Sequence, residues 1–233
     1  MSAPPSPVRS SGVRRKAATP DPLGRPRLRG WLHLNGAVVA VVCSAVLIPL
    51  AATVSGLAVA AAAVYAFGVS ACFGISALYH RRIWGPRGYQ WMRRLDHAAI
   101  FLLIAGTYTP YCLLLLEPGA ATVLLAVVWS GAGLGILLQL AWPDAPRWLS
   151  VPIYVALGWT AVVVMPQVLD RGGVTVLVLL LAGGLAYSVG ALCYALKRPN
   201  PWPHVFGYHE LFHAFTLAAA ICHHIGVYFA LFS

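Results

Sequence analysis

Apolar residues are grouped along this chain in long runs, separated by short polar connections. After a polar N-terminal stretch, the runs are each roughly 20 residues long, and a helix of that length rises about 30 Å, the thickness of a bilayer's hydrocarbon core. The pattern therefore predicts an all-α membrane protein. We expect a seven-transmembrane helix bundle with spans near residues 31–53, 57–80, 95–116, 120–141, 149–169, 173–196 and 205–232.

The first 29 residues differ from the rest of the chain. They are rich in Pro, Ser and Arg and show no hydrophobic periodicity, so they cannot bury enough apolar area to fold. The sequence predicts a disordered basic tail over residues 1–29, followed by a single membrane domain over residues 30–233. The first apolar run begins only near Trp31, without a small-residue cleavage site, which is not typical of a signal peptide.

Composition agrees with a membrane location. Of the 233 residues, 60% are hydrophobic and only 9% are charged, whereas a soluble domain has about 25% charged residues. The net charge of +10 would suit a nucleic-acid partner, but so little of the chain lies outside the predicted spans that no nucleic-acid binding is expected. Membrane lipids are the expected partners.

The basic residues also predict orientation. Of the 16 Lys and Arg residues, all except Arg171 fall in the tail or in the second, fourth and sixth connections between the predicted spans. Cytoplasmic loops of membrane proteins carry an excess of Lys and Arg. We therefore expect a multi-pass protein of the cell membrane with a cytoplasmic N-terminus and, after seven spans, a C-terminus outside.

Several predicted spans carry polar or ionisable groups. A charge at the centre of a membrane helix costs about 2.5 to 3.5 kcal/mol on insertion scales, so such groups indicate function unless they lie at the interface. They occur in three short motifs: Ser76 and His80 in SALYH, Asp96 in RRLDHAAIFLLIAGTYTP, and His209, Glu210 and His213 in YHELFHAF.

The expected topology brings these groups together. The second predicted span ends at His80 on the cytoplasmic side, and the third and seventh spans begin on that side, near Asp96 and His209. Residues four apart lie on one helix face, so His209 and His213 point the same way. Three protein ligands and a water are the catalytic form of zinc. The sequence therefore predicts a zinc site at His80, His209 and His213, with Asp96 holding or deprotonating the water.

Simpler interpretations exist for each residue alone. A helix serine such as Ser76 often bonds its own helix carbonyl, and Asp96 beside Arg93 and Arg94 is typical of a helix N-cap. The HELFH segment also matches H-E-x-x-H, in which Glu210 would be the general base of a metalloprotease. His33 begins the first span in the same layer and is expected as a hydrogen-bond donor behind the ligands. His223 and His224 lie about 15 Å beyond His213 and are expected to pack or face the interface.

Three segments together resemble a known family: SALYH, DHAAIFLLIAGTYTP and HELFHAFTLAAAICHH. They are similar to segments of the hemolysin III family, the bacterial branch of a group that includes the progestin and adiponectin receptors. The resemblance covers essentially everything after the tail. It implies a seven-helix protein with zinc bound by the residues at His80, His209 and His213, with Asp96 contacting the metal-bound water and Ser76 nearby. It also implies kinship with alkaline ceramidase-like membrane hydrolases.

Three functions follow as hypotheses. The first is a zinc-dependent hydrolase of membrane lipid amides or esters, or a role in membrane lipid homeostasis, with the lipid entering the bundle laterally. The second is a receptor-like or homeostatic protein in which zinc is structural and nothing is turned over. The third, ranked lowest, is an intramembrane metalloprotease using HELFH, because the third histidine already comes from another span and no further zinc-ligand motif is present.

Overall fold

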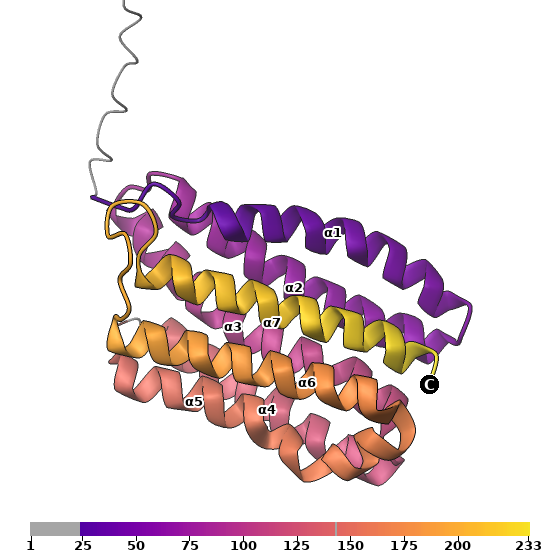
Figure 1. Ribbon diagram of the computed structural model, residues 1–233. Helices are drawn as coiled ribbons and strands as arrows, with labels where there is room; N and C mark the ends of the chain where they lie inside the picture. The colour runs from indigo at the N-terminus through magenta and orange to yellow at the C-terminus, as the bar shows by residue number, and fades with distance from the viewer. Residues whose placement is uncertain (1–23, 143) are drawn as a thin grey trace, which may run out of the picture.

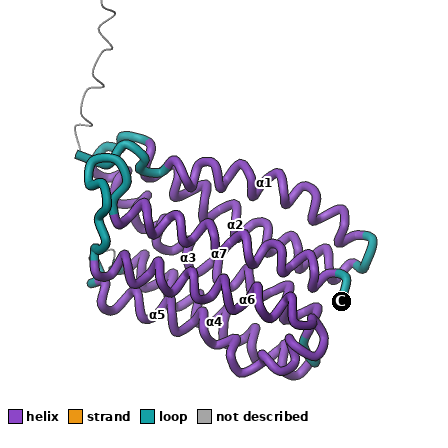
Figure 2. Tube along the Cα trace, in the orientation of Figure 1, coloured by secondary structure: helices purple, strands orange, loops and turns teal. Residues whose placement is uncertain are grey.

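A computed structural model describes residues 24–142 and 144–233, and within them the chain is helical. Figures 1 and 2 show one bundle of long helices with loops at its two ends. In chain order the elements are α1 (Trp31–Ala52), α2 (Gly56–Arg81), α3 (Pro86–Leu115), α4 (Pro118–Ala141), α5 (Arg147–Trp159), the 3-10 helix η1 (Thr160–Val164), α6 (Met165–Leu196) and α7 (Tyr208–Leu231).

The structure supports several membrane spans but does not confirm the predicted number of seven. In the described residues, 6 segments are long and apolar enough to cross a membrane, and one of them is the 50-residue stretch Arg147–Leu196. This stretch comprises α5, η1 and α6, and α5 with 13 residues is too short to cross by itself. Its helical course is broken at Gly173, which has φ 73° and ψ 178°. Such a positive φ favours glycine, which has no Cβ to clash.

Helix α3 begins earlier than expected. The hydropathy of the chain places its start near residue 95, but the helix begins at Pro86, directly after its N-cap Gly85. Proline is favoured in the first turn, where its missing N–H would have no helical partner. The added turns carry Arg87, Arg93 and Arg94, which suit the polar interface and not the hydrocarbon core. The helix is therefore longer than the predicted span 95–116, because hydropathy reports membrane depth and not helix length.

The helix ends beside residues 24–30 form a distinct basic surface. Residues 24–30, the α2–α3 loop and the α6–α7 loop lie at the same end of the bundle, on the left in Figure 1. We call this the basic end, because the loops and helix ends there carry Arg81, Arg82, Arg87, Arg93, Arg94, Arg147, Lys197 and Arg198. Arg171, the exception in the charge pattern, forms an ion pair with Glu117, the N-cap residue of α4.

The predicted tail is described only at its C-terminal end. Residues 1–23 lie outside the described residues. Arg27 and Leu28 donate their backbone N–H groups to the carbonyls of His204 and Val205, at 3.0 and 3.1 Å. The segment directly before α1 is therefore tied to the α6–α7 loop.

Glycines allow α2 and α3 to pack closely. A Cβ added at Gly68 of α2 would lie 3.0 Å from the Leu102 carbonyl oxygen, and one added at Gly106 of α3 would lie 3.2 Å from the Val64 carbonyl oxygen. Small residues at such contacts let membrane helices approach and gain van der Waals packing. This contact holds the helices that carry His80 and Asp96 in a fixed relation.

We expect Gly68→Ala to lower the free energy of unfolding by about 1–3 kcal/mol, the usual cost of overpacking a tight site. The added methyl group would press on backbone, which yields less readily than a side chain. Thermal unfolding of the purified protein measures the effect. Gly74→Ala on the same helix is the matched control, because an added Cβ there meets nothing within 4 Å. Equal melting temperatures for the two variants would contradict the close contact.

Candidate metal centre

The three predicted ligands come from two helix ends at the basic end of the bundle. His80 is the penultimate residue of α2, and His209 and His213 lie in the first turns of α7. His80 and His213 are buried, at 6% and 2% exposure. The spacing of four residues in α7 places both of its imidazoles on the face toward α2. Local helix geometry therefore accounts for two of the three positions, and the packing of α2 supplies the third.

The imidazoles converge. One ring nitrogen from each of His80, His209 and His213 lies within 4.8 Å of the others. The Nε2 atoms of His209 and His80 are 3.2 Å apart. Two ligands at a tetrahedral zinc ion with bonds of 2.0–2.1 Å would be about 3.3 Å apart. The structure thus brings the predicted ligands together at a spacing that fits zinc, and the binding of a metal stays a prediction.

Asp96 faces this cluster from α3. Its Oδ2 atom lies 3.9 Å from His80 Nε2, and its side chain is 13% exposed. Ser76 and Asp96 both line the cavity beside the cluster. Because α3 begins at Pro86, Asp96 is in the third turn and is not an N-cap. The simpler interpretation of Asp96 as a helix N-cap is therefore wrong, and its carboxylate is free to act in the candidate metal centre.

His33 contributes more to the cluster than its sequence position indicates. Its ring stacks on that of His213, with centroids 3.6 Å apart and an interplanar angle of 10°. It is 3% exposed, and neither ring nitrogen has a hydrogen-bond partner among the described residues. A metal bound by His213 would lie in the plane of the His213 ring. The His33 ring lies in a parallel plane, so its nitrogen atoms do not point at that metal. His33 thus lines the site, and its ring nitrogen atoms are available to a bound group.

Glu210 is engaged away from the cluster. Its Oε2 atom accepts a hydrogen bond from the Gly207 backbone N–H at 2.8 Å, and its Oε1 atom accepts one from Nε of Arg29. The carboxylate therefore caps the first turn of α7 and is 1% exposed. This arrangement gives Glu210 a structural role and does not favour the metalloprotease hypothesis, in which it would activate a water.

The segment before α1 holds the site from the basic end. Arg25 donates from Nη1 to the His80 carbonyl oxygen at 2.9 Å, and Arg29 pairs with Glu210. Gly30 has φ 77°, and a Cβ there would come within 2.8 Å of both the His80 Cβ and the Arg81 Cγ. The chain therefore passes directly over the end of α2, and only glycine suits this position. Sequence reasoning missed these contacts because the segment has no periodicity.

We expect Arg29→Gln to lower stability more than Glu210→Gln. Removing the arginine leaves a buried carboxylate without its charged partner, a change that typically costs about 3–5 kcal/mol. Glutamine at position 210 still accepts from Gly207, and Arg29, with a side chain 20% exposed, can reach solvent. Thermal unfolding of both single variants, the double variant and the exposed control Arg27→Gln tests this order. Loss of peptide turnover in a folded Glu210→Gln protein would instead favour the protease hypothesis.

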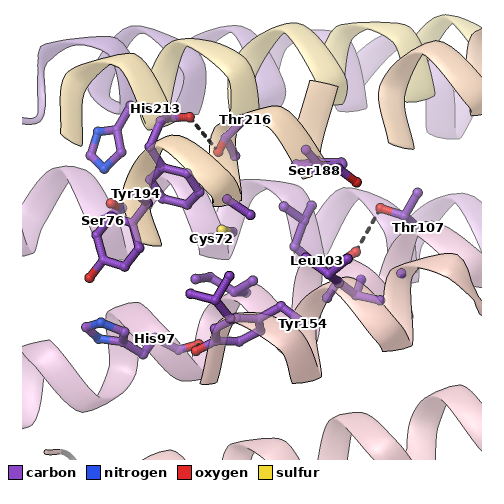
Figure 3. A pocket seen from close by; sticks show the side chains of 18 of the residues that line it. Cys72, Ser76, His97, Leu103, Thr107, Tyr154, Ser188, Tyr194, His213 and Thr216 are labelled. Atoms are coloured by element: carbon purple, nitrogen blue, oxygen red, sulfur yellow. Dashed lines mark hydrogen bonds between the residues drawn. The ribbon is translucent and has the colours of Figure 1, made fainter. Parts of the chain in front are cut away.

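A cavity opens beside the histidines. Its volume is about 150 Å³, and it is lined by residues of α1, α2, α3, α5, α6 and α7. Most of the lining is apolar or aromatic, with Ser76, Asp96, His209 and His213 among the polar residues. In Figure 3, His213, Ser76, Tyr194 and His97 lie at one end of the cavity, and Thr107 and Ser188 lie toward the other. The candidate metal centre thus faces a mostly apolar space.

The remaining histidines lie in different surroundings. His97 lines the cavity, and its Nδ1 bonds the Arg93 carbonyl at 2.7 Å. His204 is exposed in the α6–α7 loop. His223 is buried, as expected of a packing residue, and it also lines the cavity at some distance from His213. His224 instead contacts the Tyr65 hydroxyl at 3.1 Å.

Comparison with known proteins gives a consistent result. The sequence profile of the family described as haemolysin-III related matches residues 23–224. Hemolysin-3 of Bacillus cereus is 33% identical over 190 residues, which cover 81% of this chain and 83% of that protein.

Eukaryotic proteins are also similar to this chain. A heptahelical transmembrane protein of Oryza sativa subsp. japonica is 30% identical over 183 residues, covering 70% of this chain and 79% of that protein. The adiponectin receptor protein of Drosophila melanogaster is 28% identical over 182 residues, which cover 69% of this chain and 40% of that protein. With its buried histidine cluster in a helical membrane bundle, the chain belongs to the haemolysin III family, within the superfamily of progestin and adiponectin receptors.

Proposed function

We propose that this protein is a zinc-dependent hydrolase that cleaves amide or ester bonds of membrane lipids. The observation that carries the proposal is the convergence of three imidazoles beside a carboxylate at the end of an apolar cavity. An open three-ligand site of this kind is the catalytic form of zinc. The apolar cavity favours a lipid over a peptide or sugar as substrate.

The chemistry of the donor set supports zinc. Neutral imidazole nitrogens are ligands that zinc prefers, although other divalent transition metals also bind them. His80, His209 and His213 would hold the ion. When bound, zinc lowers the pKa of a coordinated water and polarises a substrate carbonyl.

The chain's own residues supply the remaining functions. The Asp96 carboxylate, 3.9 Å from the His80 ring, accepts a proton from the attacking water and returns it to the leaving amine or alcohol. Ser76, which lines the same cavity as Asp96, orients that carboxylate and can donate to the developing oxyanion. His33, with two unpartnered ring nitrogens, borders the position of the reacting group.

The substrate reaches the site from the membrane. Helix α5 contributes Val151, Tyr154, Val155 and Gly158 to the cavity lining, while its buried residues are Ser150 and Leu157 alone. A single helix therefore separates the cavity from lipid on this side. Lateral entry of a lipid past α5 keeps its acyl chain out of water throughout.

The same proposal includes the arrangement of the protein in the cell membrane. Seven crossings are supported by the break at Gly173 and by α5 lying beside α6 in Figure 1, which together let Arg147–Leu196 cross twice. The concentration of Lys and Arg at the basic end supports a cytoplasmic N-terminus and a cytoplasmic metal site. A C-terminal reporter that is active only outside the cytoplasm tests this, and activity from an N-terminal fusion would overturn it.

The deciding experiment is elemental analysis of the detergent-purified protein, followed by incubation of the same preparation with ceramides and phospholipids and analysis of the products by mass spectrometry. We expect about one zinc per chain and release of a fatty acid. Removal of the metal with a chelator should abolish release, and zinc should restore it. Zinc without any product would reject the hydrolase, and protein without metal would reject the site.

A structural metal is the second candidate. Among the described residues, α2 and α7 make few direct contacts, so an ion shared by His80, His209 and His213 would tie these helices together. In this case His80→Ala should lower the melting temperature to that of the metal-free wild type, while the intact protein turns over no lipid. Turnover by the wild type would exclude this interpretation as the whole function.

A further inference from the structure

The apolar cavity contains polar atoms at some distance from the histidine cluster. In the part of the chain that the structure describes, the Tyr187 hydroxyl and the Nδ1 atom of His223 are buried and have no hydrogen-bond partner. Both residues line the cavity, and their ring centroids are 5.5 Å apart. Neither residue is used by the proposed hydrolytic site.

These two residues lie well away from the metal ligands. His223 follows His213 on α7 by ten residues, which corresponds to about 15 Å along the helix. Tyr187 is on α6, opposite α7. The two residues therefore border a deep part of the cavity, where the chain of a lipid held at the histidines would run.

The His223 ring is fixed by its surroundings. Its Nε2 lies 3.3 Å from the Leu180 carbonyl oxygen, and its own carbonyl accepts a hydrogen bond of 2.7 Å from Tyr111. The ring also lies against Gly183, where an added Cβ would come within 2.3 Å of it. Small movements of the ring are therefore restricted, and the direction of its free nitrogen is set by the fold.

The hydrogen-bonding roles of the pair follow from these contacts. A carbonyl oxygen only accepts, so Nε2 of His223 is the donor to Leu180, and Nδ1 of the neutral ring is then an acceptor. The Tyr187 hydroxyl can donate. The complementary group has one hydrogen to donate and an oxygen that accepts, which describes an alcohol. A methylene chain would leave both atoms unsatisfied, at a cost of about 1–3 kcal/mol for each group.

We propose that Tyr187 and His223 form a second polar subsite in the cavity, which binds a hydroxyl group carried along the hydrocarbon chain of the lipid ligand. That the ligand is a lipid held at its polar end by the histidine cluster rests on the proposed function. The subsite makes the protein selective for hydroxylated acyl chains over plain ones. A single water needs only about 10–15 Å³, so a cavity of about 150 Å³ has room for a hydroxyl group and the part of a chain that carries it.

The test compares ligands that differ only in the hydroxyl. Binding of octadecanoic acid and of a series of its monohydroxy isomers, with the hydroxyl moved along the chain, is measured by calorimetry on the full-length detergent-purified protein. We expect one mid-chain isomer to bind about tenfold more tightly than the plain acid, the effect of one well-placed hydrogen bond. Isomers with the hydroxyl near either end should bind no better than the plain acid.

Two variants assign the preference to the pair. Tyr187→Phe should reduce the binding of the preferred isomer to that of the plain acid while leaving the melting temperature of the ligand-free protein unchanged or higher, because no internal hydrogen bond is lost. His223→Gln keeps a donor near Nε2 but loses the Nδ1 acceptor, and should also remove the preference. Tyr228→Phe is the control, because its hydroxyl donates to the Cys43 carbonyl at 3.2 Å and does not line the cavity.

Each outcome decides. Equal binding of all isomers to the wild type, as expected if only water occupies the subsite, overturns the proposal, and so does a preference that survives in Tyr187→Phe. The assay measures binding without hydrolysis, so a hydroxyl preference in a protein that cleaves nothing would reject the hydrolase and keep the subsite. Hydrolysis without any hydroxyl preference would do the reverse.

Discussion

The His209→Ala variant is expected to purify without metal and without lipid-cleaving activity. His209 supplies one of three imidazoles within 4.8 Å of one another, and its Nε2 is 3.2 Å from that of His80. Two remaining ligands hold zinc far more weakly. Removal of a group that only supports a ligand costs about 10- to 100-fold in metal affinity, and loss of the ligand itself should exceed that.

Elemental analysis and product release on the same preparation measure both effects. The matched control is His204→Ala, which removes an exposed imidazole from the loop before α7 and should keep the metal and the activity. A His209→Ala protein with a full complement of zinc would remove this residue from the ligand set. Zinc that is lost while turnover continues would show that the metal is not catalytic.

The Asp96→Asn variant should separate metal binding from catalysis. Asparagine has nearly the same shape as aspartate but cannot take a proton from water. We expect zinc content to stay at the wild-type level while turnover falls by about 100- to 10,000-fold, the usual contribution of a general base. The Ser76→Ala variant should also lower turnover, but by less than Asp96→Asn does, because Ser76 acts through the Asp96 carboxylate.

Asp144→Asn is the control for this experiment. Asp144 is exposed and pairs with Arg93 at 2.7 Å, so its substitution removes a carboxylate near the same end of the bundle without touching the cavity. Lipid cleavage at the wild-type rate by Asp96→Asn would exclude Asp96 from the reaction. Loss of zinc from that variant would instead make Asp96 part of the metal-binding set.

The histidine cluster could be predicted from sequence because it depends on two simple regularities. Helix periodicity places His209 and His213 on one face, and the alternation of helix direction places the end of α2 beside the start of α7. Neither argument needs knowledge of side-chain packing. The same arguments brought Asp96 to the correct layer, although they placed it at the start of a helix that begins at Pro86.

Features that depend on packing between distant segments could not be predicted. The stacking of His33 on His213 and the pairing of Arg29 with Glu210 join residues far apart in sequence, and no periodicity indicates either contact. The break at Gly173, by contrast, lies where the sequence predicts the end of one span at residue 169 and the start of the next at residue 173, because Asp170 and Arg171 interrupt the apolar run there. The depth of the cavity depends on where small residues such as Gly158 and Gly184 leave space, which is a property of the assembled bundle.

The position of Glu210 has a consequence for how protein sequences are searched. A survey of membrane proteomes for H-E-x-x-H would count this chain as a candidate peptidase. Here the motif begins at the second residue of α7, so its glutamate occupies the third helical position, where it caps the backbone of Gly207. In a zincin the same five letters lie within a helix and the glutamate acts on water. Recording where the helix begins would separate the two cases and reduce false assignments.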